Sequence, residues 1–236
     1  MKELRQRIAG ARRIVAFTGA GISVESGIPT FRGPGGLWRT YRAEELATAN
    51  AFHRNPKLVW EWYDSRRQIM AQAEPSAGHR ALAALERRCG GFTLVTQNID
   101  GLHNRAGSRR VLKVHGDIWR LRCMDCEHEA DDFRTPMPDL PPRCQCGGLL
   151  RPGVVWFGEY LPRDIWSEAE SAASGAEVFL TIGTSAVVYP AAGLIDTARR
   201  GGALIVEVNP QETPYSQSVD HSLRGPAGEI LPELLG

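Results

Sequence analysis

The stretch that decides the fold class is Ile14-Val15-Ala16-Phe17-Thr18-Gly19-Ala20-Gly21. It is a short apolar run that ends at two glycines, which is typical of a strand buried on both faces of a sheet. Comparable apolar runs follow at residues 92–95, 111–114, 178–182 and 203–208. Amphipathic helical patterns lie between them, at roughly residues 56–72, 78–88, 163–174 and 190–200. Buried strands that alternate with helices predict a Rossmann-like α/β fold with a doubly wound parallel sheet.

The composition is that of an ordinary globular protein. The chain has 236 residues, of which 42% are hydrophobic and 23% charged, and its formal net charge is +1. This charge gives no electrostatic reason to expect binding to nucleic acids or membranes. No stretch reaches the roughly 18 apolar residues of a membrane span, and the charged first seven residues do not resemble a secretory leader. We therefore expect a cytoplasmic protein.

Four of the five cysteines form two close pairs, in Cys123-Met124-Asp125-Cys126 and Cys144-Gln145-Cys146. Four thiolates in two such pairs suit a closed tetrahedral site for one structural zinc ion, and reduced free cysteines are the alternative. An odd count in paired clusters also favours a metal site in a reducing compartment over disulfides.

Two segments interrupt the α/β pattern. Residues 118–150, which hold the paired cysteines, predict a small zinc-ribbon domain inserted in a larger domain made of residues 1–117 and 151–236. Residues 28–50 contain the run Gly33-Pro34-Gly35-Gly36 and predict a long, mobile loop with little regular structure.

Polar motifs follow the predicted strands at their carboxyl ends, where open α/β sheets bind ligands. The glycines of residues 19–23 let backbone amides approach a phosphate, although a tight turn that binds nothing is the alternative. The motif at residues 97–100 can bind a carboxamide through its amides and carboxylate, or can cap a helix. His115 ends the third strand and is placed as a general base, with a structural histidine as the alternative. Weaker candidates at the same edge are Gly183-Thr184-Ser185 and Asn209-Pro210.

Taken together and in this order, the motifs resemble the sirtuin family. The matching stretches are Gly19–Ser23, Pro29–Arg32, Thr96–Asp100, His115-Gly116, the four cysteines, Val154–Glu159, Gly183–Ser185 and Asn209-Pro210. The resemblance extends from about residue 10 to the end of the chain. It implies NAD-dependent removal of acyl groups from protein lysine, with NAD as a consumed co-substrate.

The resemblance also implies a role for each matching residue. His115 would be the base that deprotonates a ribose hydroxyl after the acyl oxygen has attacked the ribose and nicotinamide has left. The acylated lysine would lie along Val154, Trp156, Phe157, Gly158 and Glu159, by addition of a strand. The residues implied to bind NAD are Gly19, Ala20, Gly21, Ile22 and Ser23, then Phe31 and Arg32 of the mobile loop, then Gln97, Asn98 and Asp100, and finally Gly183, Thr184, Ser185, Asn209 and Ala227.

A subtype is indicated within the helical pattern at 56–72. Tyr63 and Arg66 are three residues apart and share one helix face, where a phenol and a guanidinium can bind a carboxylate. An exposed helix face with a solvated arginine is the alternative. The pair resembles that of the sirtuin class that removes succinyl and malonyl groups, in which the small residue Ala43 would leave room for the acyl chain. We therefore expect desuccinylase and demalonylase activity, with deacetylase activity retained as an open alternative.

Three rival functions remain at this point. An NAD(P)-dependent oxidoreductase would explain the glycine turn, but Val24 stands where the oxidoreductase fingerprint has its third glycine. A zinc-ribbon module that binds nucleic acids would explain the cysteines, but the near-neutral net charge of the chain argues against it. ADP-ribosyl transfer to protein would use the same cleavage of NAD.

Overall fold

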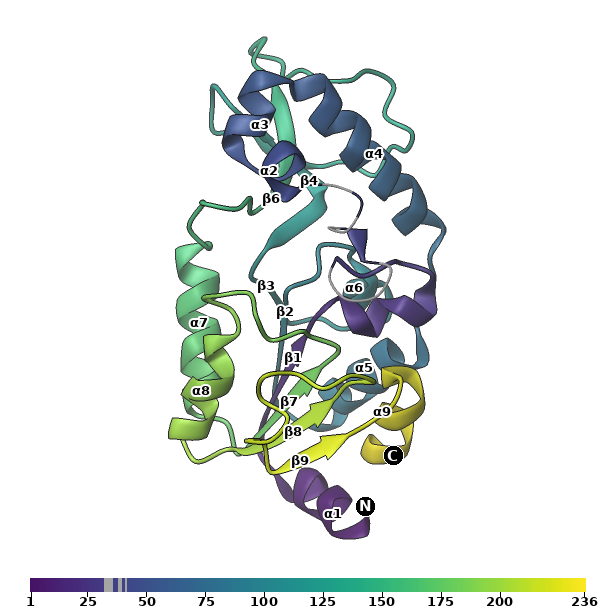
Figure 1. Cartoon of the computed structure of the whole chain (residues 1–236), viewed down its shortest axis with the longest axis vertical. Helices are drawn as coiled ribbons and strands as arrows, with labels where there is room; N and C mark the ends of the chain where they lie inside the picture. The colour runs from purple at the N-terminus through teal and green to yellow at the C-terminus, as the bar shows by residue number, and fades with distance from the viewer. Residues whose placement is uncertain (32–35, 38–39, 41) are drawn as a thin grey trace.

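The larger layer of the molecule is a six-stranded parallel sheet. The computed structural model describes residues 1–31, 36–37, 40 and 42–236. The strand order is β3-β2-β1-β7-β8-β9, which is the doubly wound arrangement predicted. Its strands are β1 (Arg13–Thr18), β2 (Gly91–Thr96), β3 (Val111–Lys113), β7 (Val178–Ile182), β8 (Leu204–Val208) and β9 (His221–Leu223). Apolar runs form the central strands because both faces of this sheet are covered by helices (Figure 1).

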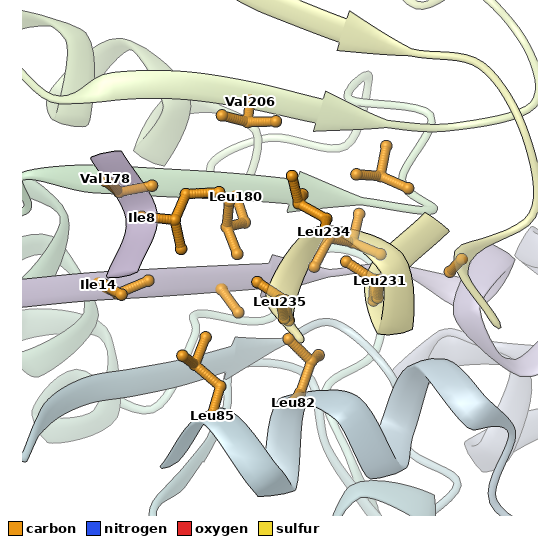
Figure 2. Close-up of a cluster of buried hydrophobic side chains, with 14 of the residues drawn as sticks. Ile8, Ile14, Leu82, Leu85, Val178, Leu180, Val206, Leu231, Leu234 and Leu235 are labelled. Atoms are coloured by element: carbon orange, nitrogen blue, oxygen red, sulfur yellow. The ribbon is translucent and has the colours of Figure 1, made fainter. Parts of the chain in front are cut away.

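Alternate residues of β1 enter two different cores. Ile14 and Ala16 pack with α1 (Lys2–Gly10), α5 (Ala77–Arg88) and α9 (Ala227–Leu235) on one face. Figure 2 shows this cluster around Ile14 and Leu180. Val15 and Phe17 pack with α7 (Arg163–Ser174) and α8 (Gly193–Arg200) on the other face.

A smaller layer lies at one end of the parallel sheet. It contains a three-stranded sheet in the order β5-β4-β6, with β4 (Gly116–Cys123) antiparallel to β5 (Glu129–Asp131) and to β6 (Leu150–Val154). Three helices share one core with this sheet, in which Trp60, Trp119 and Trp156 are buried. They are α2 (Ala43–Leu46), α3 (Ala49–Arg54) and α4 (Pro56–Gln72). Helices from outside residues 118–150 therefore complete the hydrophobic core beside the zinc ribbon, whose boundaries stay a prediction.

Several elements differ from the prediction. The loop expected over residues 28–50 contains α2 and the first residues of α3, so the expectation of little regular structure is wrong there. A 3-10 helix, η1 (Ala20–Ser26), follows β1, and the short helix α6 (Leu102–Arg105) follows β2. Helix α8 begins at Gly193 rather than at residue 190. Among the described residues, no helix is long and apolar enough to cross a membrane.

Candidate active site

A cavity of about 690 Å³ lies between the carboxyl ends of the parallel strands and the smaller layer. The turn after β1, the segment after β2 and the turn after β7 line one side of it. Residues from α4 and from the segment that follows β6 line the other side. The strands β1 and β7 are neighbours at the centre of the sheet, with β2 and β3 added on the side of β1 and β8 and β9 on the side of β7. Doubly wound sheets bind ligands at this point, where the strand order reverses.

His115 lies on the wall of the cavity, in the connection between β3 and β4. Its Nδ1 lies 3.2 Å from the carbonyl oxygen of Gln97, so Nδ1 carries the hydrogen and Nε2 is the basic nitrogen. Burial lowers the pKa of His115, and the bond to Gln97 only partly opposes this effect. The imidazole is therefore neutral at neutral pH and can accept a proton, which a general base requires.

The neighbouring Gly116 fixes the position of His115. Its φ is +80°, and a Cβ atom at this residue would lie 2.1 Å from the carbonyl oxygen of Gly153. Only glycine fits this close approach between β4 and β6.

Asn98, Ser23 and Asp100 form one buried network behind the cavity. The Ser23 hydroxyl donates to Asp100 Oδ2 at 2.7 Å, and Asn98 Nδ2 donates to the Gly19 carbonyl at 3.1 Å. Asp100 Oδ1 accepts from the amide of Leu102 at 2.9 Å. Burial raises the pKa of Asp100, although both hydrogen bonds to the carboxylate oppose the rise. Asn98 lines the cavity, while Ser23 and Asp100 hold the turn and Asn98 in place from behind it.

Thr184 connects the segments after β2, β7 and β8. Its hydroxyl accepts from Gln97 Nε2 at 2.9 Å, and its carbonyl accepts from Asn209 Nδ2 at 2.8 Å. All three side chains line the cavity. These bonds hold together the ends of three strands that are far apart in the sequence.

The turn after β1 packs directly against the turn after β7. The amide of Gly19 donates to Ile182 and the amide of Gly21 donates to Gly183, at 2.9 and 2.7 Å. The amides of Gly19 and Gly21 are therefore used within the protein. The role of the Gly19–Ser23 turn in holding a phosphate stays a prediction. Ala20, which lies between them, also lines the cavity.

The segment predicted to pair with substrate is not a continuous strand. β6 ends at Val154, the amide of Phe157 donates to Ala47, and Glu159 closes a turn by donating its amide to the Trp156 carbonyl. Val154, Trp156, Phe157, Gly158 and Glu159 all line the cavity.

The proposed acyl-carboxylate pair is only partly on the cavity. Tyr63 lines it, whereas Arg66, 3% exposed, and Ala43 are not among the described lining residues. Ala47, one helical turn after Ala43, lines the cavity in its place. Arg67 is turned away, because its guanidinium donates to the carbonyls of Ile118 and Asp132.

Of the other residues predicted to bind NAD, some line the cavity and others do not. Phe31, Gly183 and Ser185 line the cavity, while Ile22 and Ala227 are buried in the core, where Pro226 takes the lining position expected for Ala227. Arg32 lies outside the described residues. The cavity is also lined by residues that were not predicted from the sequence, among them Ala47, Trp62, Ile99, Tyr189, Gln211 and Glu212. The spacing of four residues from Ala43 to Ala47 could have identified the first of these.

The four paired cysteines meet at one point beside β4. Their Sγ atoms all lie within 4.8 Å of one another, and the Sγ atoms of Cys123 and Cys146 are 3.5 Å apart. Four sulfur ligands at these distances are positioned to bind one zinc ion, with no coordination position left for a substrate.

Comparison with known proteins identifies the family. The model of the Sir2 family matches residues 19–190. The chain belongs to the Sir2 family. It is 57% identical to the NAD-dependent protein deacylase of Aquifex aeolicus over 88% of this chain and 87% of that protein. It is 49% identical to NAD-dependent protein deacylase 1 of Pseudomonas aeruginosa, over 100% of this chain and 98% of that protein.

Solved structures agree with this membership of the Sir2 family. A Sir2 homologue in complex with NAD superposes with a TM-score of 0.94 at 48% identity, covering 100% of this chain and 92% of that one. A complex of Sir2 with a p53 peptide and NAD⁺ superposes with a TM-score of 0.90 at 35% identity, covering 100% and 97%.

Proposed function

We propose that this Sir2 protein removes acyl groups from lysine side chains, consumes NAD, and produces nicotinamide and O-acyl-ADP-ribose. The observation that carries the proposal is the neutral His115 on a cavity shared by the turn after β1 and the segment after β6. Relatives at 49 and 57% identity are named NAD-dependent protein deacylases, and a family structure holds a peptide together with NAD⁺.

Different residues along the cavity have different proposed roles. Gln97, Asn98 and His115 lie beside the ribose and nicotinamide, and Nε2 of His115 accepts the proton of a ribose hydroxyl. Thr184 and Asn209 lie beside the adenosine half, and Arg32 stays a predicted contact. The apolar and aromatic side chains after β6 enclose the acylated lysine and exclude water from the reacting atoms.

We further propose that the preferred acyl groups are succinyl and malonyl. Tyr63 supports this, because it places a hydroxyl among the apolar lining at the end of the cavity next to the smaller layer. Arg66 lies one turn later on the same face of α4 and supplies a positive charge to the acyl carboxylate.

The test is mass spectrometry of acetyl- and succinyl-lysine peptides of one sequence, incubated with and without NAD. NAD-dependent loss of succinyl with appearance of O-succinyl-ADP-ribose is expected. Arg66→Met is expected to reduce succinyl turnover at least tenfold more than acetyl turnover, since a hydrogen bond to a charged group contributes about 1.5–3 kcal/mol. The matched control is Arg54→Met, at an exposed position at the end of α3. Equal losses on both peptides would remove the carboxylate role, and no loss of either acyl group from wild type would remove the deacylase proposal.

A further inference from the structure

A group of side chains centred on Trp156 lies at the acyl end of the cavity. The indole nitrogen of Trp156 donates to the hydroxyl oxygen of Tyr63 at 3.0 Å. Both side chains are almost fully buried, at 2% and 3% exposed, yet both line the cavity. The bond therefore joins the segment after β6 to α4 at the place where the acyl group is proposed to end.

The direction of this bond decides what the Tyr63 hydroxyl can do. An indole N–H is a donor only, so the phenol oxygen is the acceptor and its own hydrogen must point elsewhere. No described residue accepts that hydrogen, and the cavity is the open side. Burial raises the pKa of Tyr63 well above its ordinary value, so the hydroxyl keeps its hydrogen and remains a donor at neutral pH.

Trp156 is itself held on its ring and on its backbone. The guanidinium carbon of Arg151 lies 3.4 Å from the centroid of the indole ring, and the ring of Phe52 packs at 5.2 Å. Arg151 Nη1 and Nη2 donate to the two carboxylate oxygens of Glu159, at 2.5 and 2.9 Å. Glu159 Oε2 also accepts from the backbone amide of Trp156 at 2.8 Å. A two-point ion pair of this kind is rigid, and here it fixes the indole in position and plane.

We propose that Arg151, Glu159 and Trp156 form a positioning unit that turns the Tyr63 hydroxyl into an oriented donor for an acyl carboxylate. The unit acts through Tyr63 and so selects acyl chains that end in a carboxylate over acetyl. This inference rests on the proposed function, because it assumes that Tyr63 meets such a carboxylate.

The test is a double-mutant cycle on the ratio of kcat/KM for succinyl- to acetyl-lysine peptides of one sequence. Wild type, Trp156→Phe, Tyr63→Phe and the double variant are compared. Tyr63→Phe is expected to lower the ratio about tenfold, and Trp156→Phe about three- to tenfold, because it removes the bond that orients and polarises the hydroxyl. In the Tyr63→Phe background, Trp156→Phe is expected to change the ratio no further. A role in packing alone would change the ratio equally in both backgrounds, or not at all, and either result would overturn the inference.

Arg151→Lys is the second variant, in case Trp156→Phe does not fold. It keeps the charge but loses the planar stacking and the two-point pair, so it is expected to lower the ratio only when Tyr63 is present. A decrease that does not depend on Tyr63 would overturn the inference. An unchanged ratio in Tyr63→Phe itself would instead show that the succinyl assignment under the proposed function is wrong.

Discussion

A buried histidine outside the cavity makes the stability of the protein depend on pH. His79 lies in the first turn of α5, and its Nδ1 accepts a hydrogen bond from the amide of Ser76 at 3.1 Å. Protonation would place a hydrogen on this Nδ1, against the Ser76 amide. Burial, with a smaller contribution from the charge of Arg80, lowers the pKa of His79 from 6.5 to about 4.

The sign of the effect follows from the lowered pKa. Between pH 6.5 and about 4, the unfolded chain binds a proton at His79 that the folded chain excludes. The stabilising contribution is complete above pH 6.5 and is lost as the pH falls toward 4. At about 1.4 kcal/mol for each pKa unit, the free energy of unfolding decreases by about 3 kcal/mol over this range.

The measurement is urea unfolding of wild type and of His79→Gln at pH values from 7 to 4. Glutamine is suited to this position of a capping box and does not titrate, so the variant keeps the local structure and loses the part of the pH dependence that comes from His79. The neighbouring His103, whose pKa burial also lowers, keeps its own part in both proteins. The exposed His53→Gln is the control, and it is expected to follow wild type. Parallel pH profiles for wild type and His79→Gln would refute the reasoning.

Three further outcomes are expected. Elemental analysis should find one zinc per chain, and a chelator should lower the melting temperature and abolish activity, because the zinc ribbon shares a core with α4 on the cavity wall. Arg67→Met should lower the free energy of unfolding by about 3 kcal/mol in urea titrations, because the fully buried guanidinium pairs with Asp132 and backbone carbonyls. Gly21→Ala should lower the stability of the NAD-free protein by about 1–3 kcal/mol, whereas Gly90→Ala, where a Cβ meets open space, should not.

The sequence predicted the central parallel sheet because its strands are buried on both faces and appear as continuous apolar runs. β9 was missed because its three residues are only half-buried, and α9 because Pro232 interrupts its pattern. β4 was missed because its exposure does not alternate regularly and its pairing with β6 shifts register between Asp117 and Leu121. Short helices such as α3 depend on a single side-chain cap, here Thr48, which composition does not reveal.

The site was predictable as a location but not as a set of contacts. Strand ends place Asn98, Asp100 and His115 at one edge of the sheet, and the paired cysteines predict their own cluster. The sequence could not show that Asp100 meets Ser23, 77 residues away, and so supports the cavity from behind. It also could not separate Ala43 from Ala47, because only the packing of α2 against the segment after β6 decides which alanine faces the cavity.

The glycines after β1 show why a glycine motif is weak evidence for a phosphate site. A Cβ atom on Gly21 would lie 2.6 Å from Gly183 Cα, and one on Gly19 would lie 2.8 Å from the Gly183 carbonyl oxygen. The ends of β1 and β7 lie so close together that only small residues fit in the turns that follow them, whether or not a ligand is bound. If the stability of the NAD-free Gly21→Ala variant decreases as expected, contact between these turns explains the glycine, and the case for nucleotide binding rests on the cavity and on the family. If Gly21→Ala instead keeps its stability and loses only NAD affinity, the glycine is needed for the close approach of a phosphate, as the sequence predicts.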